Sequence, residues 1–250
     1  MHELPLEPPR GIDGAIDALG ALRDNLARFM AQYQFGIDEV MTKLRILSEE
    51  CRLDGPDGPI EHISSRVKSP QSIVEKVLRR GIEPSFEAIA TEITDVAGIR
   101  VVCSFVQDVY RVSELLAQQS DVRVLRVKDY IAEPKPNGYR SLHFILEIPV
   151  FLAQGAVPVT VEVQFRTIAM DFWASLEHKI HYKYRGEVPA ELVASLKQAA
   201  DTAAELDQRM ESLHAEVQGL RAEDGAAGMG IDVDTLRQLA ELGLRSLEKH

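Results

Sequence analysis

The sequence is poor in cysteine and has no long apolar run. Among its 250 residues, Cys51 and Cys103 are the 2 cysteines. Their separation matches no zinc or redox motif, and they cannot build a disulfide framework. No stretch approaches the roughly 20 apolar residues that cross a bilayer. The acidic, proline-containing start, residues 1–9, lacks the apolar centre of a secretory signal. We therefore expect a cytoplasmic protein with reduced thiols and no membrane partner.

Acidic residues outnumber basic ones, with 39 Asp and Glu against 28 Lys and Arg. The formal net charge of -11 argues against a general nucleic-acid coat, so RNA binding has no support from composition. Lysine and arginine are nevertheless denser between Arg66 and Arg185 than at either end, which leaves room for a local basic pocket. Common catalytic motifs are absent as well: there is no Walker or dinucleotide fingerprint, no Gly-x-Ser-x-Gly and no His-Glu-x-x-His.

The stretch from Val159 to Arg166 alternates apolar and polar residues. This period of two predicts a strand whose successive side chains point to opposite faces of a sheet. One face would be apolar, and the other would present Thr160, Glu162, Gln164 and Arg166 together. A strand that merely faces water could show the same pattern.

The residues after this strand predict a helix capped by Thr167. Its apolar stripe consists of Ile168, Phe172, Trp173, Leu176 and Ile180, so we expect one side of the helix to be buried, with Trp173 as a core anchor. Charged residues lie between these positions. A row of acid, amide and base that runs into a charged helix suits a phosphate and metal site.

Strand and helix patterns alternate over the rest of the chain and predict an α/β (α+β) fold with a mixed, mainly five-stranded sheet flanked by helices. We expect one long helix from Leu19 to Leu47, or two with a bend near Gly36. Other expected elements are helices at Gln71–Arg80, Ser85–Ile93, Val109–Gln119 (capped by Asp108), Glu191–Arg221 and Val233–Leu247, and strands after Asp95, at Val122–Val127 and at Leu142–Val150. We expect residues 1–59 to form a helical extension, 60–185 the central domain and 186–250 C-terminal helices suited to oligomerisation.

Two regions could bind phosphate. Ser69 is a good N-cap, Pro70 a good first helical residue and Gly81 a good stop, so an anion could lie at this helix start beside Arg66 and Lys68. A surface turn that happens to be basic explains the same residues. The second region is the loop between Tyr130 and Leu142, where Lys135, Tyr139 and Arg140 suit phosphate contact and base stacking.

Asp95, at a strand entrance, and Glu162, within a strand, are candidate magnesium ligands if their strands are neighbours. Magnesium is commonly bound by one or two carboxylates together with substrate phosphates. Two acids so far apart in sequence do not establish a metal site. Reasoning from the residues alone therefore ends at a cytosolic α/β protein with a candidate nucleotide-phosphate pocket.

Taken together in order, several motifs resemble the synthetase domain of the bacterial stringent-response proteins. They are Arg66–Ser69 (RVKS), Asp95–Val101 (DVAGIRV), Lys128–Ala132 (KDYIA), Pro134–His143 (PKPNGYRSLH) and Glu162–Thr167 (EVQFRT). Residues 170–173 and 176–179 are similar to the short, stand-alone branch, the small alarmone synthetases, which make guanosine tetra- and pentaphosphate, (p)ppGpp. The His-Asp dipeptide of the hydrolase domain in the longer relatives is absent, so we expect no hydrolase activity.

The resemblance implies a nucleotidyltransferase-like fold and a magnesium-dependent reaction in which the β,γ-pyrophosphate of ATP moves to the 3′-hydroxyl of GDP or GTP, releasing AMP. It implies that Asp95 and Glu162 hold Mg²⁺, that Glu162 also takes the hydroxyl proton, and that Gln164 assists. On the ATP side, it implies that Arg66 and Arg100 sandwich adenine while Lys68, Ser69 and Lys76 hold phosphates.

On the acceptor side, the resemblance implies roles for Lys128, Lys135, Tyr139, Arg140, His143, Asp171 and Glu177. Tyr139 would stack on guanine, with His143 close to the phosphates. A carboxylate, Glu177 or Asp171, would read the guanine N–H groups, although a favourable charge at a helix N-terminus explains Asp171 nearly as well. Phe165 stands where relatives commonly have an aliphatic residue, which we interpret as core variation.

The short relatives form homotetramers, and some bind their pentaphosphate product in a central cleft, so we expect a homotetramer with (p)ppGpp as a potential effector. Two other functions are left open. One is a guanine-nucleotide, alarmone or RNA sensor without turnover, and the other is a generic nucleotidyltransferase that releases pyrophosphate.

Overall fold

The computed structural model describes residues 12–54, 58–183 and 189–223. The helix expected at 233–247 lies outside the described residues. In chain order the elements are α1 (Ile12–Asp54), β1 (Ile60–Val67), α2 (Pro70–Arg80), α3 (Phe86–Glu92), β2 (Ala97–Cys103), α4 (Val106–Ala117), β3 (Arg123–Asp129), β4 (Leu142–Leu152), β5 (Gly155–Thr167), α5 (Ile168–Lys183) and α6 (Ala190–Glu223).

The strands form one mixed sheet in the order β1-β2-β5-β4-β3, which confirms the expected five-stranded architecture. β2 and β5 are parallel, whereas the other three neighbouring pairs are antiparallel. β3 therefore points the same way as β2, but β5 and β4 lie between them. The strand-helix-strand unit β2-α4-β3 is thus a long crossover, and β5 is the central strand of the sheet.

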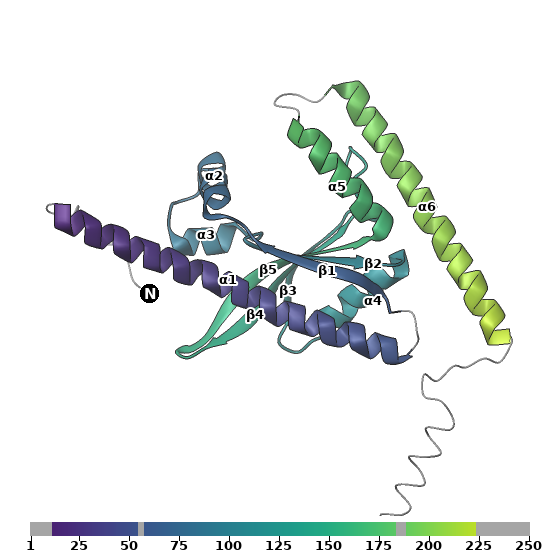
Figure 1. The fold of residues 1–250 in the computed structure, drawn as a ribbon, viewed down its shortest axis with the longest axis horizontal. Helices are drawn as coiled ribbons and strands as arrows, with labels where there is room; N and C mark the ends of the chain where they lie inside the picture. Colours follow the sequence, from purple (N-terminus) through teal and green to yellow (C-terminus); the bar gives the residue numbers. More distant parts are fainter. Residues whose placement is uncertain (1–11, 55–57, 184–188, 224–250) are drawn as a thin grey trace, which may run out of the picture.

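One face of the sheet carries the hydrophobic core. Alternate residues of β5, from Val159 to Phe165, are buried there, as the period-two pattern predicts. Residues of α1 and α4, among them Ile37, Val40 and Leu116, belong to the same buried cluster. Figure 1 shows α1 running across the sheet, with its first turns extending beyond the strands near α2 and α3.

α1 is a single helix of 43 residues, so the alternative of two helices is not realised. Gly36 lies against β5, and a Cβ placed there would be 2.7 Å from a side-chain carbon of Val159. The glycine lets the helix approach the sheet closely rather than bending it. The N-terminal extension therefore shares one core with the central domain.

Local capping signals mostly gave correct boundaries. The Ser69 hydroxyl accepts a hydrogen bond from the Ser72 N–H, and Gly81 ends α2 with φ 67°, the left-handed conformation that favours glycine. The expected cap at Asp108 was wrong. α4 starts at Val106, before Asp108, and the Asp108 carboxylate instead accepts the Phe105 N–H from the first turn.

α5 and α6 pack together beside one end of the sheet (Figure 1), around Trp173, Ala174, Leu196 and Ala200. The expected burial of the α5 stripe is only partly correct. Trp173 is buried and donates its indole N–H to the Leu196 carbonyl, as a core anchor would, but the other stripe residues at 168, 172 and 176 are exposed. Ile180 also packs against this cluster, so α6 covers a face of α5 that includes Trp173 and Ile180 but not the rest of the expected stripe.

Among the helices that the structure describes, none has the length and apolar character needed to span a bilayer. Cys51 and Cys103 are free and buried. Burial raises the pKa of the Cys103 thiol, so this side chain is a poor nucleophile.

Candidate active site

The sheet face opposite the core carries a polar row that crosses four strands. In the observed register, Arg100 of β2 is opposite Gln164 of β5, which is opposite His143 of β4, which is opposite Lys128 of β3. Paired residues point to the same face of a sheet. Residues predicted for catalysis, for ATP and for the acceptor are therefore brought together, although up to 64 positions separate them in sequence.

A second row runs parallel to the first and contains Glu162. This residue is opposite Gly98, and Gly98 is opposite Arg66 of β1. Gly98 has no side chain, and Arg66 reaches this position: its side-chain Cγ would lie 3.9 Å from a Cβ placed on Gly98. Asp95 precedes β2, just before this row. The two acids predicted as metal ligands thus come from neighbouring strands, which is the condition that the sequence left open.

Asp95 is held by two lysines. Lys68 Nζ lies 2.8 Å from one carboxylate oxygen and Lys76 Nζ lies 2.6 Å from the other. Burial alone would raise the pKa of Asp95, but the hydrogen bonds from both lysines leave it below its ordinary value. Burial lowers the pKa of Lys76 even though Asp95 opposes that effect. Lys68 and Lys76 were predicted to bind ATP phosphates. In this structure they neutralise Asp95, the candidate metal ligand, instead.

Glu162 is also hydrogen-bonded on both oxygens. His143 Nδ1 lies 3.2 Å from Oε1, and the Gln164 amide nitrogen donates to Oε2 at 3.0 Å. Burial raises the pKa of Glu162, but the hydrogen bonds and the charge of His143 outweigh burial, and the pKa is lowered overall. The nearby charge of Asp95 opposes ionisation of Glu162, so the two carboxylates are electrostatic neighbours.

These two acids fit a magnesium ion that shares its coordination with phosphates. Within the described part of the chain, no three His, Cys, Asp or Glu side chains form a ready-made metal cluster. Magnesium commonly takes one or two protein carboxylates and completes its coordination with substrate phosphates and water. Asp95 and Glu162 match that pattern, whereas a zinc or calcium cage would need more protein ligands.

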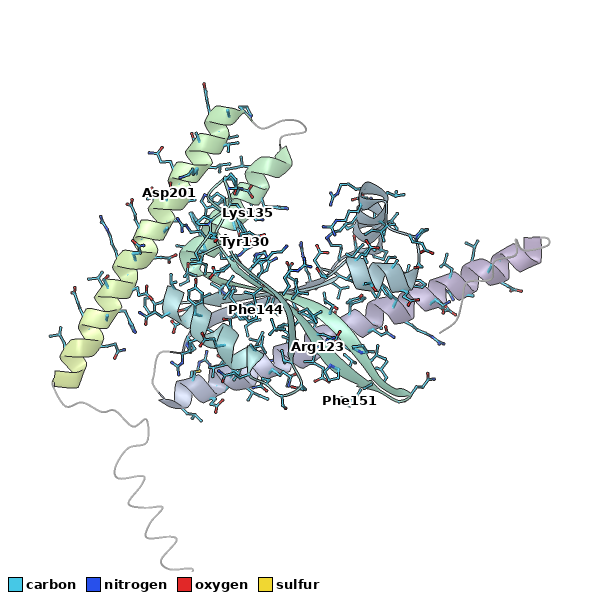
Figure 2. The ribbon with its side chains drawn as sticks, turned by 180° about the vertical axis from the view of Figure 1, so that it is seen from behind. Arg123, Tyr130, Lys135, Phe144, Phe151 and Asp201 are labelled. Carbon is cyan, nitrogen blue, oxygen red and sulfur yellow. The ribbon has the colours of Figure 1, made fainter. Side chains whose placement is uncertain are left out.

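The loop between β3 and β4 folds back over the polar row. Lys135 Nζ lies 4.6 Å from the ring centre of Tyr130 and 4.5 Å from that of Tyr139, a cation–π arrangement. Figure 2 shows Tyr130 and Lys135 side by side near α6. Gly138, with φ 89°, lets the loop lie directly against α6, because a Cβ there would be 2.5 Å from the Ala200 side chain. Tyr130 was not predicted as a site residue.

The remaining predicted acceptor residues take different places. Glu177 of α5 accepts a hydrogen bond from the Asn137 side chain at 3.3 Å, so it borders the loop. Asp171 lies in the first turn of α5 and pairs with Arg100 and Arg166. Arg140 donates to the Ile131 carbonyl and pairs at 3.8 Å with Asp201 of α6.

Two predicted ATP residues and one acceptor residue are open to solvent: Arg66, Ser69 and Lys128. Ser69 serves as the α2 N-cap, which is its local structural role. Arg66 and Arg100 lie diagonally across the β1–β2 pair on one face, as adenine stacking between them requires. Their placement is compatible with the predicted roles, which stay predictions.

Comparison with known proteins shows which family this chain belongs to. Residues 65–187 match the family described as "Region found in RelA / SpoT proteins". The chain is 47% identical over 202 residues to GTP pyrophosphokinase YwaC of Bacillus subtilis, covering 81% of this chain and 96% of the relative. It is 38% identical to GTP pyrophosphokinase YjbM of the same organism, covering 78% and 91%.

Solved structures show the same fold. The crystal structure of small alarmone synthetase 2 from B. subtilis matches with a TM-score of 0.70 at 47% identity, covering 77% of this chain and 99% of that one. That of small alarmone synthetase 1 from B. subtilis, bound to its product pppGpp, matches with a TM-score of 0.71 at 36% identity, covering 78% and 98%. The chain described here therefore belongs to the RelA/SpoT family and, within it, to the small alarmone synthetases.

Proposed function

We propose that this protein is a (p)ppGpp synthetase that transfers the β,γ-pyrophosphate of ATP to the 3′-hydroxyl of GDP or GTP. The observation that carries the proposal is the alignment of Arg100, Gln164, His143 and Lys128 across four strands beside Glu162. Family membership and the names of the relatives support it. The 3′-oxygen attacks the β-phosphorus of ATP, the bond between the α,β-bridging oxygen and that phosphorus breaks, and AMP leaves.

Glu162 takes the proton of the attacking hydroxyl. Its lowered pKa keeps it ionised at neutral pH, and its two oxygens are oriented by His143 and Gln164. A general base contributes about 10²–10⁴-fold when it is correctly placed. Asp95 and Glu162 would hold Mg²⁺, which when bound neutralises charge on the transferred phosphates.

The donor nucleotide binds along β1, β2 and α2. Arg66 and Arg100 offer planar guanidinium groups that can stack on adenine, a role that the compact ammonium of lysine does not fill. When ATP binds, Lys68 and Lys76 leave the Asp95 carboxylate and pair with the phosphates instead. The phosphates are negatively charged, as the carboxylate is. The N-terminus of α2 adds the positive end of the helix dipole, which favours an anion, although Pro70 has no N–H and the Ser72 N–H already donates to the Ser69 hydroxyl.

The acceptor binds between the β3–β4 loop and α5. Tyr139 offers its ring for the guanine, and Lys135, which lies over that ring, moves to the acceptor phosphates. Glu177 is the better candidate to read the guanine N–H groups, because Asp171 is already paired with two arginines. Lys128 serves the acceptor phosphates, and Arg140 serves them only if it leaves Asp201. His143 lies close to these phosphates while its two ring nitrogens stay with Glu162 and Tyr139.

α6 supports a proposed homotetramer. Its exposed apolar residues are Leu206, Met210, Leu213, Val217 and Leu220, spaced alternately by four and three, which is the pattern of a helix that packs against another helix. We also propose a cytoplasmic location, where both nucleotide substrates are abundant and free thiols stay reduced.

The test is label transfer from γ-labelled ATP in the presence of magnesium and GDP or GTP. The proposal predicts that label appears on the guanine nucleotide in equal amount with AMP, and that neither product forms when the guanine nucleotide is omitted. A sensor would bind nucleotide, by calorimetry, without releasing AMP. A generic nucleotidyltransferase would release labelled pyrophosphate. Either of these results would reject the synthetase assignment.

A further inference from the structure

Arg166 is a buried arginine at the end of the polar face of β5. Its side chain is 6% exposed. A guanidinium is charged at every physiological pH, so it is stable in a buried position only when its N–H groups have partners. The sequence places Arg166 on the polar face but gives it no role. The contacts of its guanidinium in the structure indicate a role.

The guanidinium of Arg166 donates from Nε to the Ser141 hydroxyl at 3.4 Å. Its two terminal nitrogens contact three side chains of the proposed site, Tyr139, Gln164 and Asp171. Nη2 donates to the Tyr139 hydroxyl at 2.7 Å and to the Gln164 amide oxygen at 3.0 Å. Nη1 donates to Asp171 Oδ1 at 3.0 Å. Because the guanidinium is planar and rigid, these partners are fixed relative to one another as well as to Arg166.

The contact with Gln164 sets the orientation of its amide. The side-chain oxygen of Gln164 faces Arg166, so the NH₂ group must face the other way, where it donates to Glu162 Oε2 at 3.0 Å. If the amide turned over, its NH₂ would meet the guanidinium and its oxygen would meet the carboxylate. Both contacts would be repulsive, and Arg166 prevents this arrangement.

The contact with Tyr139 sets a second chain of hydrogen bonds. The Tyr139 hydroxyl oxygen accepts from Arg166, and its hydrogen can then point to His143 Nε2, which lies 2.8 Å away. When Nε2 accepts, Nδ1 carries the imidazole proton. That nitrogen lies 3.2 Å from Glu162 Oε1 and donates to it. Two routes from Arg166 therefore end on the two oxygens of Glu162.

We propose that Arg166 is a positioning residue for the transfer reaction: it holds Glu162 in its productive orientation through Gln164 on one oxygen and through Tyr139 and His143 on the other. Arg166 is not itself catalytic, because it reaches Glu162 only through other side chains. By holding Tyr139, it also fixes the ring on which the acceptor guanine stacks. This inference rests on the proposed function.

Asp171 gives the same residue a link to the ATP side. Its Oδ1 lies 3.0 Å from Arg166 Nη1 and 3.2 Å from Nη1 of Arg100, the residue proposed to stack on adenine. The donor and acceptor sides thus share one carboxylate oxygen. This contact places Arg166 at the centre of the site but does not make it part of the ATP-binding surface.

The test compares Arg166→Lys and Arg166→Gln with wild type, with Arg123→Lys on exposed β3 as the matched control. Lysine keeps the charge but cannot reach all three partners in fixed directions. Loss of a residue that orients a metal ligand typically lowers activity about 10–100-fold, and Glu162 is a proposed metal ligand. We expect kcat to fall by about that factor and the KM for the acceptor to rise, while affinity for a non-hydrolysable ATP analogue changes less than about twofold. Arg123→Lys should match wild type.

A double-mutant comparison separates positioning from a general structural effect. Tyr139→Phe and Gln164→Met each interrupt one route. If Arg166 acts through these residues, Arg166→Lys should cost less than about threefold in kcat when introduced into the Tyr139→Phe/Gln164→Met background, because coupled residues are non-additive. An unchanged, fully additive loss in that background would overturn the proposal, as would a loss that parallels thermal unfolding.

Acceptor binding provides a readout independent of turnover. The chain has 1 tryptophan, and the ring centre of Trp173 lies 6.4 Å from that of Tyr139, so its fluorescence should respond to GDP. We expect the GDP dissociation constant to rise at least fivefold in Arg166→Lys. If Arg166→Lys does not fold, the single variants Tyr139→Phe and Gln164→Met still test the two routes. A wild-type enzyme that binds GDP but transfers no label would reject the proposed function, whereas unchanged GDP binding and kcat in Arg166→Lys would reject the positioning role alone.

Discussion

The side-chain nitrogen of Lys76 lies 2.6 Å from a carboxylate oxygen of Asp95. Lys68 occupies the other oxygen, so a proposed magnesium ligand is neutralised by two residues that are themselves proposed to bind phosphate. A free divalent cation would have to displace two ammonium groups without offering them a new partner. A cation that arrives with ATP brings phosphates that those groups can bind. The geometry thus favours entry of metal and ATP together.

Replacing Lys76 should reverse this preference. In Lys76→Gln we expect Mn²⁺, measured by electron paramagnetic resonance in the absence of nucleotide, to bind about tenfold more tightly than in wild type, a difference of about 1.4 kcal/mol. Affinity for the metal–ATP complex should fall in the same variant, because one phosphate ligand is lost.

Lys43 offers a matched control, because it is similarly buried and pairs with Asp121 at 2.8 Å. Lys43→Gln should leave both affinities unchanged. Equal Mn²⁺ affinity in wild type and Lys76→Gln would show that the lysine does not control access to Asp95.

Phe165 fills the core beneath the polar face. It is fully buried and packs edge-on against Phe144, with ring centres 5.6 Å apart. Truncation of a buried phenylalanine to alanine typically costs 3–5 kcal/mol, so Phe165→Ala should lower the free energy of unfolding by about that amount in urea titrations. Phe165→Ile should cost less and keep kcat near wild type. A large loss of kcat in a stably folded Phe165→Ile variant would contradict the interpretation of this residue as core variation.

The apolar stripe of α6 predicts association between copies. Leu213→Glu places a charge in the middle of the stripe, so it should reduce the mass measured by light scattering from that of a tetramer to that of a smaller species. Phe151→Glu, at an exposed position where β4 turns into β5 (Figure 2), is the control and should leave the mass unchanged. A Leu213→Glu protein with the wild-type oligomeric mass would exclude the stripe as an essential contact.

Asp207 predicts a stability difference that depends on pH. Burial is the main cause of its raised pKa, and Glu211 adds to it, while the hydrogen bond from Thr167 and the charge of Arg140 oppose it. A carboxyl whose pKa is raised by folding contributes most to stability below its unfolded pKa and loses that contribution as pH rises through the folded value. At neutral pH the buried charge is therefore a cost.

We expect Asp207→Asn, which can still accept the Thr167 hydroxyl, to melt at a higher temperature than wild type at pH 7. The difference should shrink as the pH falls towards 4. A variant that is less stable than wild type at pH 7 would mean that the ionised carboxylate stabilises the fold after all.

Short-range patterns predicted much of this structure. The alternation along Val159–Arg166, the Ser69 cap and the Gly81 stop each depend on neighbours in sequence, and all three were confirmed. The start of α4 was missed because Phe105 offers no side-chain acceptor, while Asp108 is equally suited to the cap and to the first turn. Apolar spacing along α5 could not show which side α6 would cover.

The contacts within the site depend on which strands pair and in which register, and the apolar periodicity of the sequence does not predict this pairing. Lys68 and Asp95 are 27 positions apart, and so are Tyr139 and Arg166. The residues were predicted from the resemblance, but their partners follow from strand order and register. The pairing of both lysines with Asp95, the position of Lys135 over the rings of Tyr130 and Tyr139, and the contacts of Arg166 could be recognised only in three dimensions.

Glu162 is the proposed base of pyrophosphate transfer on the polar face of the sheet. The most direct test of this role is single-turnover transfer of γ-label from ATP to GDP by Glu162→Gln. The control is Glu147→Gln on the neighbouring strand, because the Glu147 carboxylate pairs with exposed Arg123. We predict a rate about 10²–10⁴-fold below wild type for Glu162→Gln, with the fold retained, and a wild-type rate for Glu147→Gln. Transfer by folded Glu162→Gln at the wild-type rate would contradict the account.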